Sequence, residues 1–212
     1  MTKAERWRSD KLGAKMVEAL KKRHFEAYYC ATGEEAKEKA LSLIPEGHVI
    51  SWGGSETLSQ IGLLQEMRSG RYSVIDRDTA RTPEERVDLM RKALLADTFL
   101  SSSNAISEDG QLVNIDGNGN RVAAMIYGPT NVILVIGLNK AVATVEDAVR
   151  RARHLAAPTN AQRFLPDTPC AHTGACADCT AQDCICAYIS VTRISRPAGK
   201  IKVILVGEVL GF

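Results

Sequence analysis

Five of the six cysteines of the chain lie in one short segment, CAHTGACADCTAQDCIC, at Cys170, Cys176, Cys179, Cys184 and Cys186. Four thiolates can close a tetrahedral zinc site or hold an iron–sulfur cluster, because both need soft, deprotonated sulfur. The spacing differs from the Cys-x2-Cys-x2-Cys run of bacterial ferredoxins, which favours zinc or a cluster of another type. Reduced thiols, or a loop closed by disulfides, are the alternatives without metal.

A glycine pair in ISWGGSETLSQIGL, residues 50–63, predicts a second site. The segment has the pattern of a strand, a turn at Gly53-Gly54-Ser55 and a helix. Glycine lets a backbone approach a ligand closely, and the first amides of a helix attract anions. The segment has neither the lysine of a Walker loop nor the spacing of a dinucleotide fingerprint. We expect an anion site here; the alternative is an ordinary tight turn capped by Ser55.

A carboxylate and an arginine near residues 108–121 form the third candidate site. Glu108 precedes a turn and has the chemistry of a nucleophile or base, and Arg121 that of an anion ligand. The turn-rich DGNGN, residues 116–120, lies between two strand candidates and predicts a hairpin, with Asn120 and Arg121 after it. The alternatives are an exposed turn at Glu108 and a strand that begins at Arg121.

The elements that must position these residues alternate along the chain. Thr32 and Thr82 have the pattern of helix caps, and a further helix is expected from Thr144 to Ala157. Apolar runs predict eight strands, at residues 26–31, 48–52, 72–76, 97–102, 111–115, 121–127, 131–137 and 200–208. Strands separated by helices predict an α/β fold with a mostly parallel sheet flanked by helices, which the expected hairpin makes mixed.

The chain is expected to form a single domain over residues 1–212, with the cysteines in an insert at residues 166–196 before the last strand. Cys30 is expected to be a small buried core residue. The net charge of +2 requires no acidic partner, and nothing in the sequence specifies nucleic-acid binding.

The sequence predicts a cytoplasmic protein. No apolar run approaches the roughly 20 residues that span a bilayer, and the N-terminus lacks the apolar core of a signal peptide. A reducing cytosol disfavours structural disulfides, which makes metal binding or redox chemistry the better interpretation of the clustered cysteines.

Several segments, taken in order, resemble the LUD-domain family, the lactate utilization proteins. They are WGGSETLSQIGL, SSSNAISEDGQLVNIDGNGNRVA, PTNVILVIGLNKAVATVEDAVRRAR, APTNAQR and KIKVILVGEVLGF, and together they cover nearly the whole chain. The resemblance implies a Rossmann-like α/β domain similar to the sugar-isomerase and CoA-transferase superfamily. Similar LUD proteins carry four cysteines that match Cys170, Cys176, Cys179 and Cys186, which leaves Cys184 as an extra thiol.

The turn at Glu108 also resembles that of class I CoA-transferases, whose glutamate is acylated and then carries CoA as a thioester. Asp109 stands where those enzymes have asparagine, and they use two such domains where this chain has one. A CoA-transferase or isomerase mechanism therefore ranks third among the functions that we consider.

The first hypothesis is an accessory or electron-transfer component in the oxidation of L-lactate to pyruvate, with a small anionic metabolite or cofactor as ligand and iron–sulfur redox proteins as partners. The second is a non-enzymatic, metal-dependent interaction protein, in which the cysteines organise a docking surface. The candidate residues are Glu108 for catalysis, Gly53, Gly54, Ser55, Asn120 and Arg121 for the ligand, and Cys170, Cys176, Cys179 and Cys186 for zinc or an iron–sulfur cluster.

Overall fold

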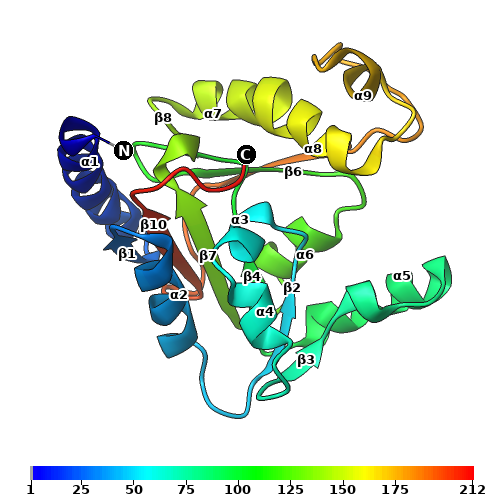
Figure 1. Cartoon of the computed structure of the whole chain (residues 1–212), viewed down its shortest axis with the longest axis horizontal. Coiled ribbons are helices and arrows are strands. Elements are labelled where there is room, and N and C mark those ends of the chain that lie inside the picture. Colours follow the sequence, from blue (N-terminus) through cyan, green and yellow to red (C-terminus); the bar gives the residue numbers. More distant parts are fainter. Residues whose placement is uncertain (1) are drawn as a thin grey trace.

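A six-stranded parallel sheet forms the centre of the computed structural model, which describes residues 2–212 (Figure 1). Its strand order is β1-β10-β7-β4-β2-β3, and the last strand of the chain lies between β1 and β7. The strands are β1 (Glu26–Cys30), β2 (Val49–Trp52), β3 (Ser73–Ile75), β4 (Thr98–Ser101), β7 (Asn131–Gly137) and β10 (Ile201–Val206). The expected α/β class and the return of the last strand to the sheet are confirmed.

The central strands are apolar because both faces of the sheet are covered. Every residue of β7 is buried, and its side chains alternate between two cores. Val132 and Leu134 belong to the core on one face, and Ile133 and Val135 to the core on the other. Cys30 of β1 is 6% exposed and belongs to the second core, as expected.

Helices cover each face with their apolar stripes. On one face, α1 (Lys3–Lys22) packs Met16 and Leu20 against the sheet. The other face is covered by α2 (Gly33–Ser42), α3 (Glu56–Gln60) and α4 (Leu63–Met67). The expected cap Thr32 is confirmed, since its hydroxyl accepts the Glu35 amide of α2.

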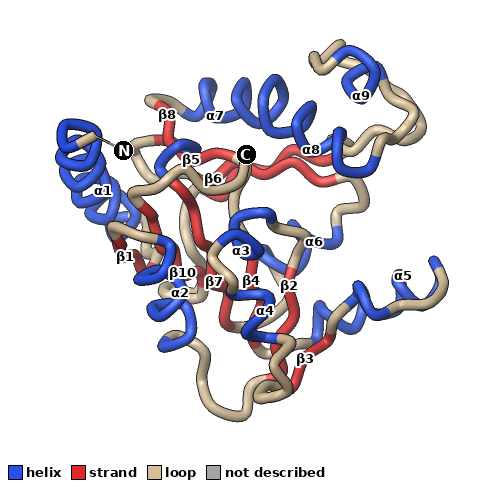
Figure 2. The backbone as a smooth tube through the Cα atoms, viewed as in Figure 1, coloured by secondary structure: helices blue, strands red, loops and turns tan. Residues whose placement is uncertain are grey.

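A second, four-stranded sheet lies beside the first (Figure 2). Its order is β8-β5-β6-β9, with an antiparallel pair β5–β6, an antiparallel pair β6–β9 and a parallel pair β5–β8. The strands are β5 (Ala105–Ser107), β6 (Leu112–Asp116), β8 (Ala141–Val142) and β9 (Tyr188–Thr192). The sequence predicted only β6 of these, because the other three are short or partly exposed.

A long helical segment covers this second sheet. It consists of α7 (Val145–Arg151), one turn of π-helix (Ala152–Ala156) and α8 (Ala157–Phe164). The small buried residues Ala148, Ala152 and Ala157 pack on Ala105 and Val113 of the sheet. The helix expected over residues 144–157 therefore exists and continues for about two further turns.

The hairpin expected at DGNGN is wrong, and residues 121–127 do not form a strand. Residues 121–126 belong to α6 (Asn120–Ile126), which packs Val122 and Met125 inward and ends before Tyr127. The Asp116 carboxylate decides this, because it accepts the backbone amides of Arg121 and Val122 at 2.9 and 3.0 Å and so starts a helix. A short apolar run does not distinguish helix from strand by itself.

The remaining helices extend from the two sheets. Helix α5 (Pro83–Lys92) begins at the expected cap Thr82 and projects from the edge next to β3 (Figure 1). Helix α9 (Pro169–Thr173) opens the cysteine segment, which ends in β9, so the expected insert supplies an edge strand of the second sheet. No helix within residues 2–212 combines the length and apolar character that crossing a membrane requires.

Candidate functional site

A cavity of about 500 Å³ lies at the carboxyl ends of β2, β4 and β7, between the central sheet and the second sheet. Ligands of open α/β sheets bind at this edge of the strands. Gly54 and Ser55 follow β2 into the lining, Ser102, Ser103 and Asn104 follow β4, and Lys140 follows β7.

Lys140 joins these three strand ends at one buried amine. Its residue is 2% exposed, and its Nζ donates to Thr57 Oγ1 at 2.8 Å and to Ser102 Oγ at 3.0 Å. No carboxylate of residues 2–212 forms an ion pair with it. Burial, reinforced by the charges of Arg151 and Arg121, lowers the pKa of Lys140 to about 7. Burial thus weakens the preference of this amine for its charged form, and an anion bound beside it would raise the pKa again.

Arg77 supplies a second cation with unused donor capacity. It follows β3, and its side chain lines the cavity with 18% of its surface exposed. Its buried Nε has no hydrogen-bond partner among residues 2–212, and Nη1 only reaches the sulfur of Met90, at 3.7 Å. Burial lowers the pKa of this guanidinium, with the nearby charge of Arg86 acting in the same direction. Asp78 Oδ1 lies 4.0 Å from this Nε, beyond hydrogen-bond distance, so the buried donor stays unpaired, which is costly.

Arg121 lines the cavity, but its terminal donors are already engaged. Nη1 donates to Ser102 O and Asn114 Oδ1, at 2.9 and 3.0 Å. Nη2 donates to Asn104 Oδ1 and Ile115 O, both at 2.7 Å. The guanidinium thus fastens the end of β4 to β6, and it adds positive charge to the cavity rather than free N–H groups.

The aliphatic part of the Arg121 side chain leaves no room for a side chain at Gly53. A Cβ at this position would lie 2.9 Å from Cδ of Arg121 and 3.1 Å from Ser101 Oγ. At Gly54 the nearest atom would be Nη2 of Arg77, at 2.7 Å. The glycine pair therefore makes room for two arginines, which is a reason that the sequence did not show.

The other expected ligand residues lie at the same cavity. Ser55 caps α3 through its bond from the Leu58 amide, and Asn120 begins α6 at the rim. Because α3 has only five residues, its dipole adds little charge. Side chains provide the positive field: Arg77, Arg86, Arg121, Lys140 and Arg163 line the cavity, opposed by Glu56 and Asp116.

The two acidic residues of the lining are engaged. The Asp116 carboxylate accepts four backbone amides, those of Asn118, Gly119, Arg121 and Val122. Glu56 lies 3.9 Å from Arg163. The lining carries five basic side chains against two acidic ones, although Arg163 pairs with Glu56 and Arg86 pairs with Asp78 at 3.1 Å.

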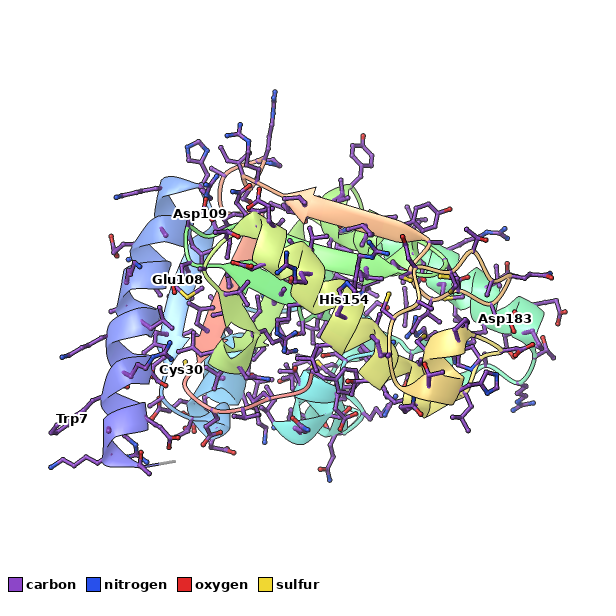
Figure 3. All side chains as sticks on the ribbon, turned by 90° about the horizontal axis from the view of Figure 1, so that it is seen from above. Trp7, Cys30, Glu108, Asp109, His154 and Asp183 are labelled. Atoms are coloured by element: carbon purple, nitrogen blue, oxygen red, sulfur yellow. The ribbon has the colours of Figure 1, made fainter. Side chains whose placement is uncertain are left out.

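Glu108 does not line this cavity. It follows β5 on the side of α1, where its carboxylate accepts a bond from Lys15 at 2.6 Å, and Figure 3 shows it beside that helix. The cavity at Glu108 is lined by α1 and by Asp109, and it contains none of the glycine-pair residues. The structure therefore separates Glu108 from Gly53, Gly54, Ser55, Asn120 and Arg121, which it brings together.

The sequence analysis missed Lys140, Arg77 and the serines after β4. Each follows a strand of the central sheet at its carboxyl end. Because ligands of open α/β sheets bind at this edge, that position in the sequence could have identified them as candidates. Lys140 comes three residues after the most apolar strand, in the segment GLNKAV, and was not singled out.

The cysteines surround a second, smaller cavity of about 210 Å³. All five thiols of the segment are free and partly buried, and Figure 3 shows the segment at the end of the molecule opposite to α1, where Asp183 is labelled. Ile185 lines both this cavity and the larger one.

Comparison with known proteins gives a family and a fold. The model of the LUD domain family matches residues 13–206. A DUF162 family protein from Deinococcus radiodurans has a similar structure, with a TM-score of 0.53 and 13% identity over 93% of this chain and 98% of that one. Ribose 5-phosphate isomerase A from Neisseria gonorrhoeae aligns over 53% of this chain and 54% of its own, with 16% identity and a TM-score of 0.34. No curated protein matches the sequence.

Proposed function

Because the chain belongs to the LUD domain family, which is associated with lactate utilization, we propose that it acts in the oxidation of L-lactate to pyruvate as an accessory or electron-transfer component. In this proposal the cavity of about 500 Å³ at the carboxyl ends of β2, β4 and β7, called the anion cavity below, binds a small anionic metabolite or cofactor. A 2-hydroxy or 2-oxo carboxylate is the best fit. The protein would work in the cytoplasm, where reducing conditions preserve its thiols.

The observation that carries the ligand part of the proposal is the excess of positive charge in the cavity. Arg77 lines the cavity, and a carboxylate accepts two parallel N–H groups of a guanidinium fork. Lys140 and the hydroxyl of Ser102 lie at the same cavity and suit the neighbouring hydroxyl or keto oxygen of the ligand.

Titration calorimetry tests the ligand. L-lactate, pyruvate, inorganic phosphate and CoA would be titrated separately into the full chain, and then into Arg77→Leu and Lys140→Met. Arg8→Leu is the matched control, since Arg8 is exposed on α1, far from the cavity. We expect lactate or pyruvate to bind, and Arg77→Leu to weaken that binding at least about tenfold, the loss typical of one charged hydrogen bond.

Two results would count against the proposal. Equal affinities for Arg77→Leu and Arg8→Leu would show that the cavity is not the binding site. Absence of binding by all four anions would favour the second hypothesis, a metal-dependent interaction protein without a small-molecule ligand. Preference for phosphate or CoA over both carboxylates would keep the site and change the class of ligand.

A further inference from the structure

The five clustered cysteines converge on one space although they come from separate parts of the segment. Cys170 lies in α9, Cys176, Cys179 and Cys184 in the following loop, and Cys186 just before β9. All five line the cavity of about 210 Å³, together with Ala157 and Pro158 of α8. The sequence alone does not specify this convergence, since cysteines in a loop of this length can equally point outward.

Contacts near this cavity attach the cysteine segment to the helical segment that covers the second sheet. Gln162 of α8 donates to the carbonyl of Cys170 at 3.1 Å, and Arg153 forms an ion pair with Asp178 in the loop. Thr168 caps α9. The segment is thus attached to the helical segment that covers the second sheet.

A single zinc ion and an iron–sulfur cluster both take four thiolates, and they differ in how far apart the sulfurs must lie. Four thiolates around one zinc, each at 2.3 Å, must lie within about 3.8 Å of one another. Within residues 2–212, no group of three or more His, Cys, Asp or Glu side chains has the arrangement of ligands around one metal ion, although Cys184 contacts both Cys186 and Cys179. A polynuclear cluster needs the sulfurs apart, because each thiolate binds a different iron atom.

We propose that the cysteine cavity binds an iron–sulfur cluster, with Cys170, Cys176 and Cys179 as three ligands and one of the pair Cys184 and Cys186 as the fourth. The sulfurs of that pair lie 3.1 Å apart, so they occupy a single corner of the cavity. The fifth cysteine is then a substitute ligand at this corner. His172 is not among the residues that line the cavity.

The cluster site adjoins the anion cavity. Ile185 lies between the paired cysteines and lines both cavities, and a Cβ on Gly117 of the larger cavity would lie 3.2 Å from the Cα of Ile185. Ile185 is therefore part of the wall of both cavities. This location supports the electron-transfer part of the proposed function. The proposal of a cluster does not itself depend on that function.

Metal analysis of the full chain tests the cluster. The protein would be purified without oxygen and assayed for iron, acid-labile sulfide and zinc, before and after reconstitution with iron and sulfide. We expect several iron atoms per chain, equimolar sulfide and visible thiolate-to-iron absorption. One zinc per chain without sulfide, or no metal after reconstitution, would overturn the proposal. These assays need no anion, so their failure is distinct from a failure of the calorimetry above.

Variants assign the ligands. Cys179→Ser should lose most of the iron, whereas Cys30→Ser, which alters a buried thiol in β1 outside the cavity, should retain it. We expect Cys184→Ser and Cys186→Ser each to keep at least half of the iron, and the double variant to lose it. Full iron in Cys179→Ser or in the double variant would contradict the assignment. If a variant does not fold, the stoichiometry of the unaltered chain still decides.

Discussion

The amine of Lys140 lies 3.0 Å from the hydroxyl of Ser102, and this contact ties the end of β7 to the end of β4 beneath the anion cavity. Both residues are buried, and the amine also donates to Thr57. An ammonium group that is held by two neutral hydroxyls, with no carboxylate partner, responds strongly to pH and to bound charge.

Anion binding should therefore depend on pH through Lys140. Its pKa of about 7, lowered by burial and by Arg151 and Arg121, rises when an anion binds, so binding takes up a proton above pH 7. We expect the affinity to fall by up to about tenfold per pH unit between pH 7 and 9. Calorimetry in two buffers of different ionisation enthalpy measures this uptake. Lys140→Met should abolish it, and an affinity that is constant over this range in the unaltered chain would refute the role.

The stability of the fold should also depend on Lys140. In the unfolded chain its pKa returns to the ordinary 10.5, so between pH 7 and 10.5 the unfolded state binds more protons than the native state. The free energy of unfolding must then rise with pH in this window. Urea unfolding at pH 7 and pH 9 should show a smaller rise for Lys140→Met than for the unaltered chain. An equal rise in both proteins would show that other groups cause it.

Alanine at the two adjacent glycines should have different effects. The Cβ of Gly53→Ala meets the stem of Arg121, which four hydrogen bonds hold in place, so we expect a loss of about 1–3 kcal/mol in the free energy of unfolding. The Cβ of Gly54→Ala meets the flexible end of Arg77. This variant should unfold within about 0.5 kcal/mol of the unaltered chain and bind the anion more weakly. The reverse order of stabilities would contradict the packing of Arg121.

Among the residues that line the cavity, Asp116 should be one of those whose substitution lowers the stability of the fold most. Asp116→Ala removes the acceptor of four backbone amides and the negative charge nearest to Arg121. We expect destabilisation of about 3–5 kcal/mol, comparable to breaking a buried ion pair. Asp88→Ala, at an exposed carboxylate of α5, is the control and should change stability by no more than about 0.5 kcal/mol. Equal urea midpoints for the two variants would exclude the capping role.

Glu108→Gln should leave anion binding unchanged. The carboxylate pairs with the exposed Lys15 and lies outside the anion cavity, so its loss should cost at most about 1 kcal/mol of stability. Calorimetry with the anion that binds the unaltered chain provides the measurement. A large loss of affinity in this variant would restore the site that the resemblance to CoA-transferases suggested.

The sequence by itself determined the α/β class and the main elements. Buried strands such as β7 are continuous apolar runs because both faces of the sheet are covered, and the caps Thr32 and Thr82 mark helix starts through local hydrogen bonds. These signals depend on residues close together in the chain, so they can be read without the fold. Gly54 and Ser55, which the sequence singled out after β2, line the cavity of about 500 Å³, and the binding of an anion there stays a prediction.

Only the tertiary structure decided what residues 116–127 form and which side chains share a cavity. The Asp116 carboxylate starts α6 at this apolar run. Lys140 and Arg77 share a cavity because β7 and β3 end at one edge of the central sheet, and α6 brings Arg121 to the same cavity. Glu108 is excluded because it lies at the other end of β5: Asn104, before the strand, lines the cavity, whereas Glu108, after it, lies beside α1. The cysteines were evident from their spacing, but their shared cavity beside Ile185 arises from the attachment of the segment to α8. Contacts between residues far apart in the chain depend on the packing of whole elements, which local sequence patterns do not specify.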